Sequence, residues 1–103
     1  MSRGTEELKG KIILVTGGAG FIGYHLSKQL LEYDCTVIGY DNLNDYYDVS
    51  IKEWRLREIK RMADEHLESR WTFIKGSIAD KSAIENIFNN YHPQIVVNLA
   101  AQA

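Results

Sequence analysis

Short apolar runs alternate along this chain with longer segments in which apolar residues recur every three or four positions. The runs are rich in β-branched residues and are typical of buried strands, whereas the spacing of the longer segments is helical. Strands that alternate with helices favour an α/β fold with a parallel sheet, right-handed crossovers and helices on both faces. Strands are expected at Lys11–Thr16, Cys35–Tyr40, Trp71–Ile74 and Ile95–Leu99, and helices after Gly20, over Val49–Glu68 and over Ser82–Tyr91.

Glycines are concentrated between the first expected strand and the first expected helix. Gly17, Gly20 and Gly23 follow the spacing G-x-x-G-x-x-G, and Gly18 completes G-x-G-x-x-G with the last two. In a dinucleotide-binding loop the first glycine permits a tight turn, the second lets the pyrophosphate approach, and the third lets the helix pack closely. The start of the helix would then offer N–H groups and its positive dipole end to the phosphates. The alternative is a tight strand-to-helix connection without a ligand.

An acidic residue, Asp41, ends the second expected strand, 18 residues after Gly23. A carboxylate at this place accepts hydrogen bonds from the ribose hydroxyls of adenosine and repels a 2′-phosphate. No arginine or lysine occurs in residues 42–48. The sequence therefore predicts NAD rather than NADP as the cofactor. The alternative is an ordinary loop aspartate that stabilises a turn.

The order β-α-β-α-β-α-β, with this glycine turn, is that of the N-terminal part of a Rossmann-type doubly wound parallel sheet. In such a sheet the strands take the spatial order 3-2-1-4. The chain has 103 residues, enough for about half of such a fold. The fourth strand would then be an open edge, through which self-association is possible.

Composition excludes several classes of partner. The formal net charge of −2 gives no overall field that favours nucleic acid or an anionic membrane. No apolar run approaches the roughly 20 residues that span a bilayer, and the polar N-terminus lacks a signal-peptide core. Cys35 is the only cysteine, which favours a reducing compartment, and we expect a cytoplasmic protein. The histidines show no metal-ligand spacing, so no metal site is expected.

Three motifs together resemble the extended branch of the short-chain dehydrogenase/reductase family. They are TGGAGFIG at the glycine turn, DNL after the second strand, and NLAAQA at the end of the fourth. Within that branch, the run DNLNDYYDVSIKEWRLREI is similar to UDP-glucuronate 4-epimerases and related nucleotide-sugar epimerases. The resemblance covers nearly all of the chain from Lys11 onward. It implies NAD as cofactor and a nucleotide sugar as the substrate of the full-length enzyme.

The same resemblance implies particular contacts with NAD. The backbone N–H groups of Phe21 and Ile22 would bind the pyrophosphate, and Asp41, helped by Asn42, would hold the ribose. Leu99 and the two alanines after it would line the ribose and nicotinamide side, where small residues leave room for the cofactor.

The adenine contact is less regular. The turn after the third strand would flank adenine through Ser77 and Ile78, but many relatives carry Gly-Asp where this chain has Gly76-Ser77, with Asp80 further on. The complete set of expected cofactor-binding residues is Gly17, Gly20, Phe21, Ile22, Gly23, Asp41, Asn42, Ser77, Ile78, Leu99, Ala100 and Ala101.

In such epimerases, NAD takes a hydride from C4 of the sugar and returns it to the opposite face after the keto sugar has rotated. The catalytic Tyr-x-x-x-Lys pair and the UDP-binding domain belong to later parts of the family's sequence. We therefore expect a disordered lead over residues 1–10 and a partial NAD(P)-binding Rossmann domain over residues 11–103, inactive alone and without catalytic residues. Tyr24 and Lys28 match Tyr-x-x-x-Lys, but they follow the phosphate turn too closely to reach the nicotinamide.

Other functions stay open at this point. A nucleotide-sugar dehydratase or reductase shares this first half of the fold, and a non-catalytic NAD-binding or self-associating module is a third possibility. On the surface, the basic residues between Lys52 and Arg70 alternate with acids, which predicts a solvated helix face. Trp54 and Trp71 are expected in the core.

Overall fold

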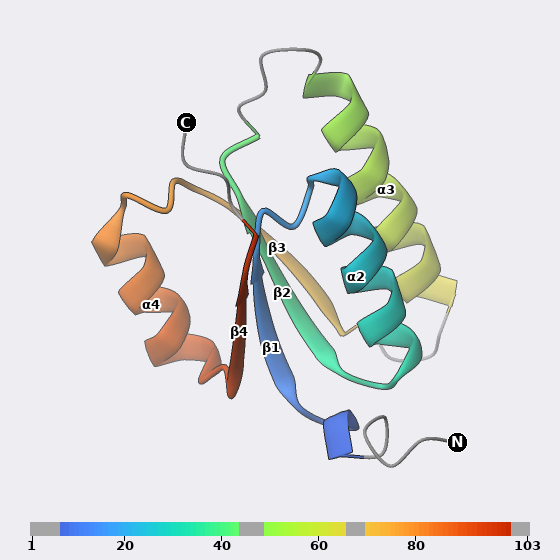
Figure 1. Cartoon of the computed structure of the whole chain (residues 1–103), viewed down its shortest axis with the longest axis horizontal. Helices are drawn as coiled ribbons and strands as arrows, with labels where there is room; N and C mark the ends of the chain where they lie inside the picture. The colour runs from blue at the N-terminus through green and yellow to red at the C-terminus, as the bar shows by residue number, and fades with distance from the viewer. Residues whose placement is uncertain (1–6, 44–48, 66–69, 100–103) are drawn as a thin grey trace.

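The computed structural model of the chain describes residues 7–43, 49–65 and 70–99. The described elements alternate between strand and helix in the predicted order (Figure 1). They are β1 (Ile12–Thr16), α2 (Phe21–Glu32), β2 (Thr36–Asp41), α3 (Val49–Glu65), β3 (Trp71–Lys75), α4 (Lys81–Tyr91) and β4 (Ile95–Asn98).

The strands form one parallel sheet in the order β3-β2-β1-β4, which confirms the predicted topology. β1 lies between β2 and β4, with Thr16 aligned to Tyr40 on one side and to Asn98 on the other. Because all strands run in the same direction, the turns that follow them meet at one edge of the sheet. β4 is the last strand of the described sheet, and Val96 within it is 47% exposed. Self-association through this edge stays a prediction.

Each face of the sheet is covered by helices, with α2 and α3 on one side and α4 on the other (Figure 1). Under α2, buried Leu30 packs with the β1 and β2 residues Val15 and Val37, and Leu8 from the N-terminal segment packs against this cluster. On the opposite face, Ile87 of α4 packs with Leu14, Ile38 and Tyr40. Burial of one such aliphatic side chain is worth about 1.5–3 kcal/mol, so these two clusters hold the layers together.

The packing of α3 differs from the sequence prediction. Ile59 and Ala63 are buried, but Trp54 is 50% exposed, so its predicted place in the core is wrong. The physical reason is the phase of the helix: at about 100° per residue, Trp54 lies about 140° around the axis from Ile59. It still contacts α2, with its ring centroid 6.1 Å from that of Tyr24. Trp71 is half-buried against the sheet core.

Two further findings concern the described part of the chain alone. No helix among these residues combines the length and hydrophobicity that crossing a membrane requires. No group of three or more potential metal-ligating side chains occurs among them.

Candidate functional site

The turn after β1 is built from glycines that allow the backbone to approach β2 closely. Gly17 has a positive φ of 75°, a conformation that glycine adopts without strain. Its N–H donates to the carbonyl of Tyr40 at 2.7 Å. A Cβ on Gly18 would lie 3.1 Å from the Cα of Gly39 in β2. The turn is therefore held against the end of the neighbouring strand.

Gly20 and Gly23 lack side chains for different reasons. A Cβ on Gly23 would overlap the carbonyl of Gly17 and lie 2.9 Å from the Cα of Gly18. Gly23 therefore lets α2 sit directly on the turn. A Cβ on Gly20 would meet the Gly17 carbonyl oxygen at 3.3 Å and no other atom within 4 Å. The packing of the protein itself would therefore tolerate a small side chain at this position. The space beyond Gly20 is open to a ligand.

The first turn of α2 presents backbone amides next to this open space. The Tyr24 N–H donates to the carbonyl of Gly20 at 2.8 Å, so the amides of Phe21, Ile22 and Gly23 precede the helix's own hydrogen-bond ladder. The side chains of Phe21 and Ile22 are 65% and 64% exposed. Unpaired amides at the positive end of a helix dipole favour an anion such as a pyrophosphate.

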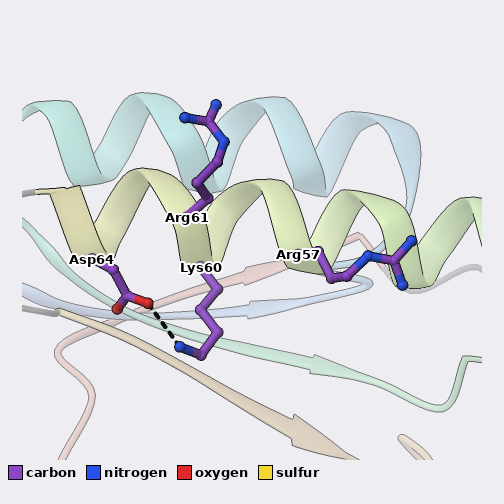
Figure 2. A pocket seen from close by; sticks show the side chains of 4 residues that line it. All are labelled: Arg57, Lys60, Arg61 and Asp64. Carbon is purple, nitrogen blue, oxygen red and sulfur yellow. Dashed lines mark hydrogen bonds and ion pairs between the residues drawn. The ribbon is translucent and has the colours of Figure 1, made fainter.

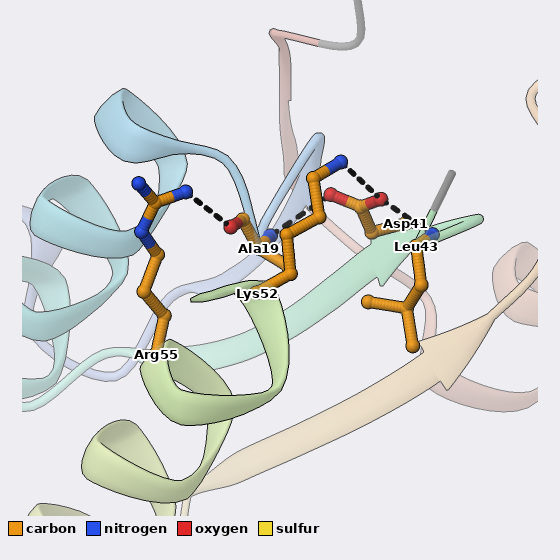
Figure 3. Close-up of polar contacts among 5 residues, drawn as sticks. All are labelled: Ala19, Asp41, Leu43, Lys52 and Arg55. Atoms are coloured by element: carbon orange, nitrogen blue, oxygen red, sulfur yellow. Dashed lines mark hydrogen bonds and ion pairs between the residues drawn. The ribbon is translucent and has the colours of Figure 1, made fainter. Parts of the chain in front are cut away.

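The carboxylate of Asp41 lies against the glycine turn (Figure 3). Its Oδ2 accepts a hydrogen bond from the Ala19 N–H at 3.0 Å, and its Oδ1 accepts one from the Leu43 N–H at 2.8 Å. The side chain is 4% exposed. The end of β2 and the turn after β1 therefore form one polar site that contains Asp41.

Two residues that the sequence reasoning placed on a solvated face belong to this site (Figure 3). Lys52 Nζ lies 3.2 Å from Asp41 Oδ1, and its side chain is 13% exposed. Arg55 donates from its guanidinium to the carbonyl of Ala19 at 3.1 Å, and its guanidinium carbon lies 6.0 Å from the centroid of the Phe21 ring. The predicted solvated face is therefore wrong for Lys52 and Arg55. Their angular position on the helix could have revealed this, because both residues lie within about 40° of buried Ile59 around the helix axis.

The turn after β3 lies beside Asp41. The Gly76 N–H donates to the backbone carbonyl of Asp41 at 3.0 Å, which places Ser77 and Ile78 next to the end of β2. The Asp80 N–H donates to the Ser77 carbonyl at 3.0 Å, and the Asp80 Oδ1 accepts a hydrogen bond from the Ala83 N–H and caps α4. One oxygen of the exposed Asp80 carboxylate is therefore engaged in the helix cap.

The remaining predicted residues lie at the ends of β2 and β4. Asn42 is exposed directly after Asp41. Leu99 follows β4, and its N–H donates to the Thr16 carbonyl at 3.0 Å, so it lies beside the end of β1. Ala100 and Ala101 lie outside the described residues.

The polar groups of the site lie along one edge of the sheet. The parts of the site lie in the spatial order of the strands: the open glycine turn after β1, the carboxylate at the end of β2, and the turn after β3. Along one edge of the sheet there is first a group of backbone amides that can bind an anion, then a carboxylate that can accept from hydroxyl groups, and then the turn after β3. This order matches pyrophosphate, ribose and base in a dinucleotide.

Comparison with known proteins decides the family. The family model described as GDP-mannose 4,6 dehydratase matches residues 14–103. The chain belongs to this family. Within the GDP-mannose 4,6 dehydratase family, and thus among the extended short-chain dehydrogenases/reductases, the chain is similar to UDP-glucuronate 4-epimerases.

Three relatives illustrate how this family member compares with others. Protein CapI of Staphylococcus aureus is 45% identical over 91 residues, which cover 88% of this chain and 25% of CapI. A UDP-glucuronate 4-epimerase of Thermodesulfobacterium geofontis is 42% identical over 90 residues, covering 87% of this chain and 26% of the enzyme. The crystal structure of a UDP-glucuronic acid 4-epimerase from Bacillus cereus, in complex with NAD and a fluorinated UDP-glucuronic acid, superposes with a TM-score of 0.70. Its sequence is 31% identical, over 87% of this chain and 26% of that one.

The chain spans about a quarter of the length of the curated family relatives it matches. The family model matches residues 14–103 of this chain, which include the glycine turn, Asp41 and the turn after β3.

A hollow lies further along α3 (Figure 2). It has a volume of about 460 Å³ and is lined by Arg57, Lys60, Arg61 and Asp64. Lys60 pairs with Asp64 at 2.7 Å, but both side chains are more than half exposed. Such a pair contributes about 0–1 kcal/mol. All four lining residues are exposed, so the glycine turn with its buried carboxylate remains the candidate site.

Proposed function

We propose that this chain is the NAD-binding segment of a nucleotide-sugar epimerase. The observation that carries the proposal is the hydrogen bond from the Ala19 N–H to Asp41 Oδ2, which joins the glycine turn to the strand-end carboxylate. Further support comes from solved relatives: the structures of the Bacillus cereus 4-epimerase and of Bordetella bronchiseptica WbmH are complexes with NAD.

In this proposal, the pyrophosphate rests over the backbone amides of Phe21, Ile22 and Gly23, where Gly20 leaves the approach open. NAD, when bound, supplies the hydride acceptor for the sugar. Asp41 accepts a hydrogen bond from a ribose hydroxyl. A carboxylate offers about four lone-pair positions, and donors from Ala19, Leu43 and Lys52 use three of them. One position is left for the ribose. Asn42, Ser77, Ile78, Leu99, Ala100 and Ala101 complete the proposed set of contacts.

Lys52 modifies the expected choice between NAD and NADP. An isolated carboxylate at Asp41 would repel a 2′-phosphate by charge. The ammonium group of Lys52, 3.2 Å from that carboxylate, partly neutralises it. We therefore propose NAD as the preferred cofactor, with a smaller discrimination against NADP than an unpaired carboxylate would give.

The reaction class of the whole enzyme rests on the relatives. Identity of 42% to a UDP-glucuronate 4-epimerase favours epimerisation of a UDP-sugar at C4. The description of the matching family favours a dehydratase as second candidate. The coding DNA that follows Ala103 discriminates between them: a Tyr-x-x-x-Lys motif without an Asp-Glu pair beside the catalytic Ser/Thr supports the epimerase. We expect the chain alone to convert no UDP-sugar.

Calorimetric titration of the folded chain with NAD tests the proposal. We expect saturable binding that Asp41→Asn weakens by about 10-fold or more, since a charged hydrogen bond is worth about 1.5–3 kcal/mol. Asp64→Asn is the matched control, because it removes the same charge from an exposed site on α3. The proposal fails if the folded chain gives no heat at millimolar NAD, or if both variants bind as the parent does.

A further inference from the structure

Arg55 contacts the two residues that flank Gly20, the glycine at which the proposed pyrophosphate approaches the turn. Its Nη1 donates to the carbonyl of Ala19 at 3.1 Å (Figure 3), and its Cζ lies 6.0 Å from the centroid of the Phe21 ring. Arg55 comes from α3, 36 residues after Ala19 in the sequence. The glycine motif therefore does not specify this contact, which forms only when α3 packs beside the turn.

The peptide group between Ala19 and Gly20 is held at both of its polar atoms. Its oxygen accepts from Arg55, and its N–H donates to the carbonyl of Gly17 at 3.0 Å. This peptide leads directly into the backbone amides that begin at Phe21. A rotation of the peptide would change the direction of those amides, so the bond from Arg55 helps to fix where they point.

Asp41 holds the other side of Ala19 and cannot take over the role of Arg55. Its Oδ2 accepts from the Ala19 N–H at 3.0 Å, whereas Arg55 donates to the Ala19 carbonyl. An ionised carboxylate only accepts hydrogen bonds, and a carbonyl needs a donor. The two side chains are therefore complementary, and the carbonyl side of the turn depends on α3.

The Phe21 ring lies between Arg55 and a second aromatic side chain. Its centroid is 4.7 Å from that of His25, in an edge-on arrangement, and the guanidinium of Arg55 lies over the ring. A cation within about 6 Å of a ring centroid is attracted to the ring face. Phe21 is 65% exposed, and these two contacts hold its ring in one place beside Gly20.

We infer that Arg55 is a positioning residue for the diphosphate of the ligand, because it orients the Ala19–Gly20 peptide and the amides that follow it. This step rests on the proposed function. Without Arg55 the turn samples further orientations, and the apparent dissociation constant rises by the inverse of the fraction of the chain that is competent to bind. Since Arg55 acts on the diphosphate part of the site, a ligand without phosphates should not depend on it.

NMR titrations of the chain with NAD and with adenosine, which carries the base and ribose without a phosphate, test the inference. Arg55→Met removes the donor and keeps an apolar stem, so the dissociation constant for NAD should rise by about fivefold or more and that for adenosine by less than about twofold. Arg55→Lys retains a charged donor and should bind NAD within about threefold of the parent. Arg57→Met is the matched control, because it removes the same charge from an exposed position of α3, and it should leave both constants unchanged.

The outcomes separate this inference from the proposed function. Urea denaturation first shows which variants are folded, and Arg55→Gln, whose side chain is too short to reach as far, replaces Arg55→Met if that variant does not fold. NAD binding equal to that of the parent in the folded variant overturns the inference and leaves the proposed function intact.

An equal loss of NAD and adenosine binding also overturns the inference, because a general distortion of the site then explains both. The same holds if Arg55→Lys does not restore NAD binding, since a donor to the Ala19 carbonyl is then not what the turn requires. If the folded parent chain binds no NAD, the proposed function fails and the inference fails with it.

Discussion

The ammonium group of Lys52 lies 3.2 Å from Oδ1 of Asp41, with side-chain exposures of 13% and 4%. The pair joins the first turn of α3 to the end of β2, across 11 residues of sequence. Asp41 also accepts two backbone N–H groups, from Ala19 and Leu43. The carboxylate therefore keeps partners if the lysine is removed.

Replacing Lys52 should lower the unfolding free energy of the chain and increase its preference for NAD over NADP. In Lys52→Met, Asp41 retains its two amide donors, so we expect a loss of about 1–3 kcal/mol in unfolding free energy, below the cost of orphaning a fully buried charge. Urea denaturation measures this loss. The preference for NAD over NADP should rise several-fold, because the unpaired carboxylate repels the 2′-phosphate more strongly.

Lys60→Met is the matched control for that experiment, because Lys60 pairs with Asp64 on the same helix at an exposed site. It should change the unfolding free energy by less than about 1 kcal/mol and leave cofactor choice unaltered. Equal effects of the two lysine variants on the NAD-to-NADP ratio would contradict the role assigned to Lys52.

The two later glycines of the turn should respond differently to the same substitution. Gly23→Ala places a methyl group onto the Gly17 carbonyl, so we expect a loss of about 1–3 kcal/mol or more from forced backbone movement. Gly20→Ala meets one backbone oxygen at 3.3 Å and should alter stability far less. Its methyl group points into the proposed pyrophosphate position, so it should weaken NAD binding instead.

Thermal unfolding combined with NAD titration checks this contrast. A Gly20→Ala variant that binds NAD as tightly as the parent would show that the ligand does not approach the turn at that position. A Gly23→Ala variant with parental stability would contradict the packing of α2 on the turn.

The sequence predicted the fold closely because its signals report burial. The β1 and β2 strands are buried on both faces, so they appear as continuous apolar runs, and their observed bounds lie within one residue of the predicted ones. The glycine spacing and Asp41 were also informative, since a strand, a tight turn and a strand-end acid have few other arrangements. The parallel order then brings Asp41 to the turn without further information.

The sequence did not reveal how α3 is rotated over the site. Periodicity defines an apolar stripe, but Trp54 and Ile51 made that stripe look wider than the buried one, and both are about half exposed. Lys52 and Arg55 extend the inner face of Ile59 and Ala63 toward the glycine turn. There Lys52 pairs with the Asp41 carboxylate, and Arg55 donates to a backbone carbonyl of the turn. A buried cation cannot be told from a solvated one until its partner, far away in sequence, is placed beside it.

Ser27 offers a test of the packing beneath α2. Its side chain is fully buried, and its hydroxyl has no hydrogen-bond partner within the described part of the chain. A buried hydroxyl without a partner costs about 1–3 kcal/mol. Ser27→Ala should therefore raise the unfolding free energy, by about 1 kcal/mol. Ser82→Ala, at an exposed helical site, controls for helix propensity; an equal gain there, or destabilisation by Ser27→Ala, would contradict the assignment.

Cys35 should act as a probe of unfolding, because it is the only cysteine in the sequence and its side chain is fully buried. Its thiol donates to the carbonyl of Leu8 at 3.3 Å. Burial, and then the negative charge of Asp34, raise the pKa of Cys35 above 9.0, although Arg70 opposes this shift. The thiolate is the reactive form, so the folded chain should react with a disulfide reagent at pH 8 far more slowly than the urea-unfolded chain.

The same raised pKa of Cys35 makes stability depend on pH. The folded state holds the thiol proton more tightly than the unfolded state, whose value is near 9.0. The stabilising contribution is therefore complete below pH 9 and is lost as the pH rises through the folded-state pKa. Cys35→Ala should be less stable at pH 7 because it loses buried volume, yet its stability should decline less steeply above pH 9. Urea denaturation across this range measures the slope, and identical slopes for parent and variant would show that the buried thiol does not titrate differently on folding.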